Sequence, residues 1–409
     1  MDTKKILFIV GLIGIVSGTS MVIFWKHKPA TLLKQTLHET ATIIPSVATE
    51  NRQEVQLCST LPLSGELSVM GNQIFEGMNL MFNKIRQDPQ FPFLFRLNVR
   101  DDHSDMEEVH KNVRILTKSS KSPLFISLFG TDTIATLLPT LHEDKILALF
   151  PVEGSSAHRN QDTRNAIFFR ASYEQEVDAL VNYSANVLQR KKIAIFYEAS
   201  DWGEAVLEAL KRVLDRYQLP LIAQTSYPQQ TLNISRAVDE ISISSPNAIL
   251  CIAQARPAYH FIQQIINKGL FKTVILGLSS LIPIQETIKE SRGIEIITSS
   301  VVPDPKRSKL AIAEEYRKDL EKFSPNRPPA PYSFEGYINA ALLVEFAKTT
   351  KIPWTTDALL QTIEKLGHVK FKGIELKFDA STRTLSSNVW LNTGHEKEWI
   401  LATKKDGNL

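Results

Sequence analysis

Short apolar runs that alternate with amphipathic segments recur from residue 54 to residue 402, and this alternation constrains the fold more than any other feature of the sequence. The runs 123–129 and 146–150 are apolar almost throughout, which is typical of parallel strands covered on both faces. In the segments between such runs, apolar residues return every three or four positions, as they do on amphipathic helices. The sequence therefore predicts an α/β fold built on parallel sheets.

The strand and helix pattern is complete by about residue 150 and begins again near residue 166. A chain of 409 residues is also longer than one hydrophobic core usually supports. We therefore predict two doubly wound α/β lobes, with a ligand cleft between the carboxyl ends of their strands. A capping box at 104–107 is expected to begin a helix of the first lobe.

The segment Ile6–Trp25 contains no charged residue and is long enough to span a bilayer as a helix. A cleaved signal peptide usually has a shorter apolar region, but here the apolar run continues past the small residues at 18–20. We expect residues 1–28 to form a signal-anchor helix that holds the protein in the membrane, and residues 29–53 to form a tether. Cleavage of the segment is the alternative.

The net charge of +3 lies in the N-terminal segment, because residues 1–53 carry six Lys and Arg but three Asp and Glu, which leaves 41 of each sign in the body. A nucleic-acid-binding protein would concentrate basic charge in its folded domain. The neutral body therefore argues against a nucleic-acid partner.

No sequence motif of a nucleotide-binding, zinc-binding or hydrolytic site occurs in the body. Cys58 and Cys251, the two cysteines, lie in apolar runs and are interpreted as buried free thiols, with a disulfide left open. We expect no catalytic residues, no metal site and no cofactor.

Five segments occur in an order that is specific for one fold: LCSTLPLSGELSVMGNQIFEGMNLMFNKI, VRDDHSD, LFGTDTIATLLPTLHEDKILALFPVEGSS, FYEASDWGEAVLEALKRVL and PYSFEGYINAALLVEFA. With these segments, residues 54–402 resemble the branched-chain amino-acid (Leu/Ile/Val-type) family of periplasmic binding proteins, which has the type I fold. The resemblance implies hinge crossings near residues 171, 300 and 371, and lobes that close over a small solute.

The same resemblance divides the body into lobes. Lobe 1 is expected to comprise residues 54–171 and 301–370, and lobe 2 residues 172–300 and 371–402, with 403–409 as a tail. The expected fold is thus two doubly wound α/β lobes joined by three hinge crossings, preceded by an N-terminal transmembrane helix.

The resemblance also implies ligand-binding residues. Gly130 and Thr131 fall where the family binds a ligand carboxylate, and free N–H groups at a helix start suit an anion. The alternative is that Thr131 or Asp132 caps that helix. From the remaining motifs, a ligand is expected at Ser64, Met70, Val152, Gly154 and Trp202.

Two positions depart from the family pattern. Where amino-acid-binding members present an aromatic residue and an acid from the second lobe, this sequence has Ala255-Arg256 and Ser279. Without the acid, a buried ligand cation would lack a compensating charge. Arg256 favours a second anionic group instead, or pairs on the surface. The ligand is therefore left open among an amino acid, an amide and a carboxylate.

The sequence leaves three classes of function, of which two are favoured. The first is an extracytoplasmic solute-binding protein that delivers its ligand to an ABC-type transporter permease. The second is a ligand-sensing or scaffold ectodomain of the same fold that regulates a membrane or envelope partner. An enzyme that uses Ser279, Glu153 or Asp201 is the least favoured of the three classes.

Overall fold

The computed structural model describes residues 52–118, 123–288, 294–351, 354–395 and 397–402, which all belong to one compact unit. Within these ranges no helix is both long enough and apolar enough to cross a membrane. The segment 6–25, for which we expect a membrane anchor, lies outside the described residues, as do residues 29–51 of the expected tether and the tail 403–409.

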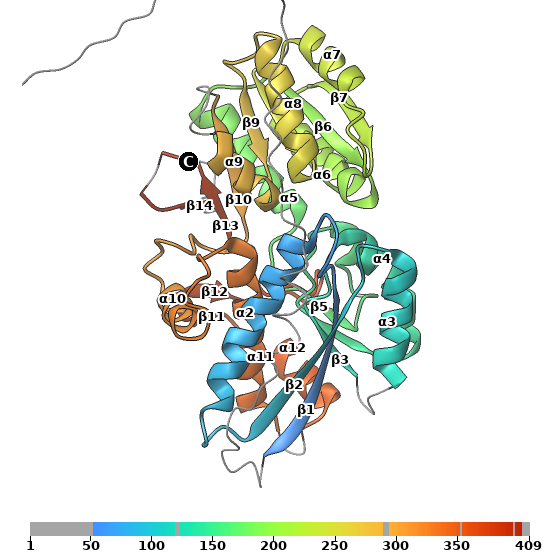
Figure 1. Cartoon of the computed structure of the whole chain (residues 1–409), viewed down its shortest axis with the longest axis vertical. Helices are drawn as coiled ribbons and strands as arrows, with labels where there is room; N and C mark the ends of the chain where they lie inside the picture. Colours follow the sequence, from blue (N-terminus) through green and yellow to red (C-terminus); the bar gives the residue numbers. More distant parts are fainter. Residues whose placement is uncertain (1–51, 119–122, 289–293, 352–353, 396, 403–409) are drawn as a thin grey trace, which may run out of the picture. The chain divides into compact units, whose positions relative to one another are not determined.

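The first lobe is built on a parallel sheet of five strands in the order β2-β1-β3-β4-β5 (Figure 1). Its strands are β1 (Gln53–Leu61), β2 (Phe93–Asp101), β3 (Leu124–Ile126), β4 (Leu147–Leu149) and β5 (Ala166–Ile167). Because all pairings are parallel, the carboxyl ends of β1, β3 and β4 lie at one edge of the sheet.

Helices cover both faces of this sheet. They are α2 (Ser68–Arg86), α3 (Met106–Lys118), α4 (Thr131–Glu143), α10 (Ala311–Phe323), α11 (Pro331–Thr349) and α12 (Thr356–Glu364). Apolar side chains of α3 and α4 pack with Phe125 on one face, whereas α2 and α11 belong to the core on the other. A hairpin of β11 (Val369–Phe371) and β12 (Ile374–Leu376) completes the lobe.

Two glycines let α2 and α11 lie in direct backbone contact. A Cβ atom at Gly77 would lie 1.8 Å from the carbonyl oxygen of Ser333, and one at Gly336 would lie 2.3 Å from that of Ile74. Any larger residue would push the helices apart. Nearly all of α11 is buried, which makes it the central helix of the lobe.

The second lobe contains a seven-stranded sheet in the order β14-β13-β10-β9-β8-β6-β7. Its strands are β6 (Ile193–Ala199), β7 (Leu221–Pro228), β8 (Ala248–Ile252), β9 (Val274–Gly277), β10 (Ile296–Ser300), β13 (Val389–Asn392) and β14 (Ile400–Ala402). The last two pair antiparallel and the rest parallel. The repeated α/β pattern thus builds two separate sheets, as predicted.

Helices again cover both faces. They are α5 (Tyr173–Asn182), which ends in a π-helical turn, α6 (Asp201–Tyr217), α7 (Ser235–Ser244), α8 (Ala255–Asn267) and α9 (Ile282–Ile288). Side chains of α7, α8 and α9 form one core with the sheet, and those of α5 and α6 belong to the core on its other face.

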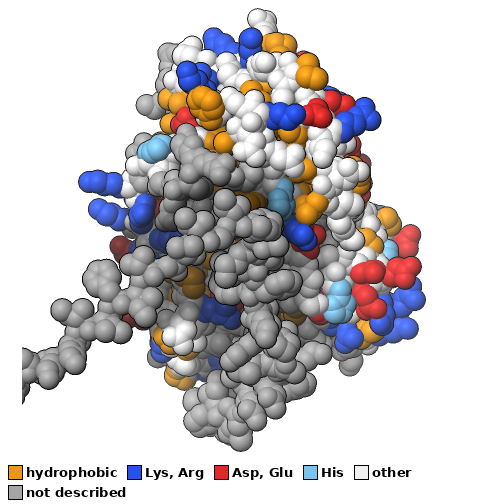
Figure 2. Space-filling view, turned by 45° about the horizontal axis from the view of Figure 1, so that its top comes forward, with side chains coloured by type: hydrophobic (Ala, Val, Ile, Leu, Met, Phe, Trp, Pro, Cys, Tyr) orange, Lys and Arg blue, Asp and Glu red, His pale blue; other side chains and the backbone are white. Residues whose placement is uncertain are grey.

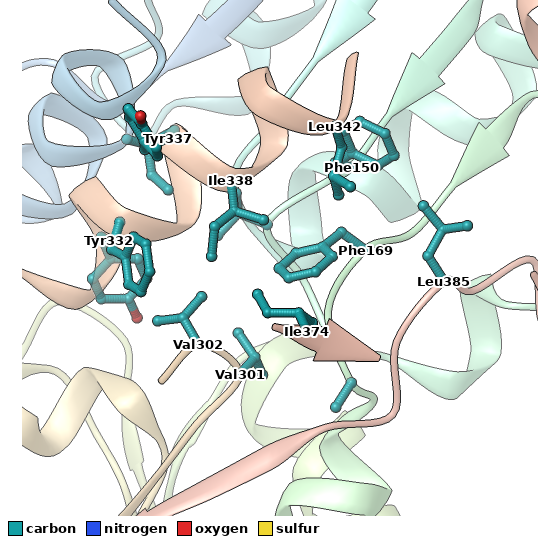
Figure 3. Close-up of a cluster of buried hydrophobic side chains, with 14 of the residues drawn as sticks. Phe150, Phe169, Val301, Val302, Tyr332, Tyr337, Ile338, Leu342, Ile374 and Leu385 are labelled. Atoms are coloured by element: carbon teal, nitrogen blue, oxygen red, sulfur yellow. The ribbon is translucent and has the colours of Figure 1, made fainter. Parts of the chain in front are cut away.

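Three crossings join the lobes, and their side chains form a shared apolar cluster. Figure 3 shows Phe169, Val301, Val302, Ile374 and Leu385 near Ile338 and Leu342 of α11, all of them buried. The first two crossings follow β5 and β10, near the expected residues 171 and 300.

We expected the third crossing near residue 371, but it comes later in the chain. Leu385 still donates a backbone hydrogen bond to Phe168 of the first lobe, and the chain joins the second sheet only at Val389. The reason is the β11–β12 hairpin, whose two short strands pair with each other instead of entering the second sheet.

A second local correction concerns the start of α3. The expected capping box would use Ser104, but the side chain of Asp105 accepts the backbone N–H groups of Glu107 and Glu108. Ser104 has φ +61° and lies in the preceding turn, which removes it from the capping position.

The two cysteines are free and buried in different lobes. Cys58 belongs to the core around α3 and α4, and Cys251 to the core around α7 and α8. Burial raises the pKa of Cys58 to about 11. On the face drawn in Figure 2, acidic and basic side chains are interspersed among the described residues, in line with the neutral body expected from the sequence.

Candidate functional site

A cavity of about 110 Å³ lies where the carboxyl ends of the strands of both lobes meet. Its lining residues come from loops and helix starts of lobe 1, from the equivalent parts of lobe 2, and from the first crossing and α11. They are Leu67, Met70, Phe129, Gly130, Thr131, Asp132, Val152, Arg170, Tyr173, Glu198, Trp202, Gln229, Gln254, Leu278, Ser279, Ser280 and Tyr332. The cavity is smaller than the roughly 300–1,000 Å³ typical of ligand pockets, which restricts it to a small group or solute.

The lobe 1 wall follows from the turn between β3 and α4. Gly130 has φ +102°, a conformation that side chains disfavour, and this turns the chain directly into the helix. Thr131 is the first helical residue, and neither it nor Asp132 caps the helix, since Gly130 holds the N-cap position. The Thr131 hydroxyl is instead hydrogen-bonded to the Tyr173 hydroxyl, 2.9 Å away on α5 of the other lobe.

The lobe 2 wall follows from the turn between β6 and α6. Ser200 caps α6 by accepting the N–H of Gly203. A Cβ at Gly203 would lie 1.8 Å from the carbonyl oxygen of Glu198, so glycine is required for the close turn. This geometry places Trp202 in the first turn of the helix and Glu198 near the end of the strand, both against the cavity.

A buried cation lies at one end of the cavity. The Arg170 side chain is held between Glu176 of α5, at 3.4 Å, and Glu335 of α11, at 3.7 Å. Burial alone would lower the pKa of Arg170, but the two carboxylates raise it above its ordinary value and keep the guanidinium charged. Its Nε is the atom that lies 3.7 Å from Glu335 Oε1, so the guanidinium faces the two carboxylates as well as the cavity.

Two carboxyl groups, those of Glu198 and Asp132, also line the cavity. Glu198 is 3% exposed and accepts a hydrogen bond from the Tyr227 hydroxyl at 2.9 Å. Burial raises its pKa, and the negative charges of Glu66 and Asp132 raise it further. Burial likewise raises the pKa of Asp132, with a further contribution from Asp201. The carboxylates that act on Arg170 are those of Glu335 and Glu176, whereas those that act on Glu198 belong to Glu66 and Asp132.

Asp132 also links the lobes. It accepts hydrogen bonds from the backbone N–H groups of Asp201 and Trp202 at the start of α6, and from the side chain of Gln229. Its buried Oδ1 has no hydrogen-bond partner among the described residues. The lobes are therefore in contact around the cavity through this carboxylate, the Thr131–Tyr173 pair and the Ser279–Tyr332 pair.

Comparison with known proteins agrees with the fold. The family profile described as "Periplasmic binding protein" matches residues 54–395. The chain belongs to the periplasmic binding protein family. It is a solute-binding protein and not an enzyme, and membership implies an extracytoplasmic location.

Individual relatives of this periplasmic binding protein are distant. The Leu/Ile/Val-binding protein homolog 7 of Brucella abortus is 21% identical over 313 residues, which cover 73% of this chain and 78% of that protein. A possible leucine/isoleucine/valine-binding protein from Rhodopirellula baltica superposes with a TM-score of 0.78 at 21% identity, covering 87% of this chain and 98% of that one. An ABC transporter solute-binding protein from R. palustris, solved with benzoate, has a TM-score of 0.72 at 16% identity, covering 85% and 96%. At these identities the solved structures show the fold alone.

Most of the residues that the sequence indicated lie together in this periplasmic binding protein. The cavity is lined by six of them, namely Met70, Gly130, Thr131, Val152, Trp202 and Ser279. The other three do not line it. Ser64 is hydrogen-bonded to His103 in a turn, Arg256 is exposed on α8, and Gly154 packs against the ring of Tyr173.

Sequence reasoning missed the charged groups of the cavity. Arg170 lies at the predicted first crossing, and Glu198 is an acid near the end of an apolar strand, which are signals that could have been used. Positions 255–256 and Ser279 bring no acid to the cavity, but Glu198 of β6 lines it. Tyr173, Tyr332 and Gln254 gave no signal in the sequence.

Proposed function

We propose that this solute-binding protein captures a small amino-acid-like solute, with the ligand carboxylate toward Arg170 and the ligand ammonium toward Glu198. The observation that carries the proposal is the presence of a buried guanidinium and a buried carboxyl group in one small cavity. Met70, Gly130, Thr131, Val152, Trp202 and Ser279 would complete the site.

The carboxylate end is supported by the groups that line it. The Arg170 guanidinium lines the cavity, and a charge-assisted hydrogen bond from it to a carboxylate would be about twice as strong as a neutral one. The hydroxyl groups of Thr131, Tyr173, Ser279 and Tyr332 surround the same cavity and can donate to an anion.

The ammonium end is supported by the electrostatics of Glu198. Burial and two neighbouring carboxylates disfavour its ionised form in the empty cavity. A ligand ammonium would reverse this preference by supplying the missing positive charge. Binding of a cation should therefore release the proton of Glu198 and shift this group toward its ionised state.

A carboxylate without an ammonium group is the second candidate solute. The aromatic side chains of Phe129 and Trp202 line the cavity and would pack against an aromatic acid. The benzoate complex of the R. palustris protein is the comparison that favours it.

Matched small molecules separate these candidates. Isothermal titration calorimetry should compare L-norvaline, which has both charges, with pentanoate and butylamine, which have one each. We expect norvaline to bind most tightly, and Glu198→Gln to remove that advantage over pentanoate. Equal affinity for pentanoate and norvaline in the native protein would favour the aromatic or aliphatic acid, and failure of all three would reject the proposal.

We further propose that residues 6–25 anchor the protein in the membrane with its lobes facing the periplasm, and that it delivers its solute to an ABC-type permease. The family and the transporter-linked relatives support delivery. Sensing by a ligand-regulated ectodomain is the alternative, since lobe closure could equally be read by a membrane partner. Uptake of radiolabelled solute by cells with and without the gene would distinguish the two.

A further inference from the structure

A second chamber of about 330 Å³, bordered by the exposed residues Glu66, His103, Gln229 and Gln230, lies next to the cavity on the side of Glu198. Leu67, Glu198, Gln229 and Gln254 line both spaces, so the chamber adjoins the solute cavity. A solute with its ammonium at Glu198 therefore has room for an extended side chain beyond it.

The chamber is polar and acidic. Glu66 of lobe 1 and Glu198 of lobe 2 contribute carboxylates, and Gln229, Gln230 and Gln254 contribute amides. Among the described residues that line the chamber, His103 alone is basic, and its Nδ1 is 3.2 Å from a carboxylate oxygen of Asp101. The carboxylates of Glu66 and Glu198 thus face a space without a dedicated cation.

A second observation points to a missing donor at the same end. The buried Oδ1 of Asp132, in the adjoining cavity, accepts no hydrogen bond from the described residues. Buried polar atoms are normally paired, so an unpaired carboxylate oxygen beside a cavity is suited to a ligand donor. The negative charges of Glu66 and Asp132 also disfavour the ionised form of Glu198, which a cation between the lobes would relieve.

We propose that the solute is a basic amino acid whose terminal ammonium or guanidinium group extends past Glu198 into this chamber, beside Glu66 and the glutamine amides. This assignment rests on the proposed function for the position of the α-carboxylate and α-ammonium. It goes further by assigning the solute's side chain to a cationic class.

Calorimetry on the full-length chain in detergent tests the assignment. L-lysine and L-norleucine have the same carbon chain and differ in the terminal ammonium, while cadaverine has ammonium groups but no carboxylate. We expect lysine to bind about tenfold more tightly than norleucine, the size of one good charge interaction. Glu66→Gln should weaken lysine binding several-fold and leave norleucine unchanged, whereas Glu107→Gln, at an exposed carboxylate of α3, should change neither.

Each other outcome has a defined meaning. Norleucine binding as tightly as lysine would overturn the cationic assignment and leave the proposed function standing. Binding of cadaverine that depends on Glu66, with lysine binding no tighter, would support the chamber and reject the carboxylate part of the proposed function. If none of the three compounds binds, both proposals fall.

Discussion

Replacing Arg170 with methionine should destabilise the protein strongly, because this guanidinium is the cation between a carboxylate from each lobe. The side chains of Arg170, Glu176 and Glu335 are 5%, 0% and 4% exposed, so water cannot compensate for the lost charge. Methionine fills a similar volume without a charge.

The magnitude follows from the geometry. Removal of one partner from a buried ion pair costs about 3–5 kcal/mol, because the remaining charge stays buried without compensation. Burial already raises the pKa of Glu176 and Glu335, and Arg170 opposes that rise. Without Arg170, Glu176 and Glu335 would bind protons more tightly in the folded state than in the unfolded state. The free energy of unfolding of the variant should then fall as the pH rises.

Urea denaturation at pH 5 and pH 8 measures this effect. We expect Arg170→Met to lose about 3–5 kcal/mol at pH 8 and clearly less at pH 5. Adding Glu176→Gln and Glu335→Gln should recover much of the loss at pH 8. As a control, Arg236→Met removes an exposed ion pair with Glu240 and should cost less than about 0.5 kcal/mol. A loss below about 1 kcal/mol at pH 8, or the same loss at both pH values, would refute the reasoning.

Three further predictions follow from single positions. Trp202→Ala should weaken solute binding at least about tenfold in calorimetry, the loss expected for an aromatic wall, with an unchanged melting temperature; unchanged affinity would remove Trp202 from the site. Gly77→Ala should lower the free energy of unfolding by about 1–3 kcal/mol or more, because it overpacks α2 against α11. Gly367→Ala is the control and should be tolerated, since a Cβ there meets nothing within 4 Å. Equal melting temperatures of the two variants would contradict the close helix contact. Burial raises the pKa of Asp102 from 3.8 to about 6, so this carboxyl group takes up a proton on folding at intermediate pH. The free energy of unfolding should therefore fall by about 3 kcal/mol as the pH rises from about 4 to above 6. Asp102→Asn should flatten that part of the stability profile, and an unaltered profile would reject the assignment.

The two lobes could be predicted from sequence because buried parallel strands have a distinctive pattern. Runs such as 146–150 are apolar on both faces, and the helices between them have clear apolar faces. The third crossing was placed too early because the short strands β11 and β12 look like any other strand. Only their pairing with each other shows that they stay out of the second sheet.

The candidate site was predictable where it depends on the backbone and not where it depends on distant side chains. Gly130, Thr131 and Trp202 follow strand ends, and the α/β pattern brings strand ends together. Arg170 is different, because its partners Glu176 and Glu335 come from helices 159 residues apart in the sequence. Glu198 was missed because its burial against Tyr227 is a tertiary contact that no local pattern reports.

The most direct test of the account is a crystal structure of the protein grown with L-lysine. The account predicts ligand density in the cavity between the lobes, with the carboxylate beside the Arg170 guanidinium and the α-ammonium beside Glu198. An empty cavity at saturating solute, or the same solute bound elsewhere, would contradict it.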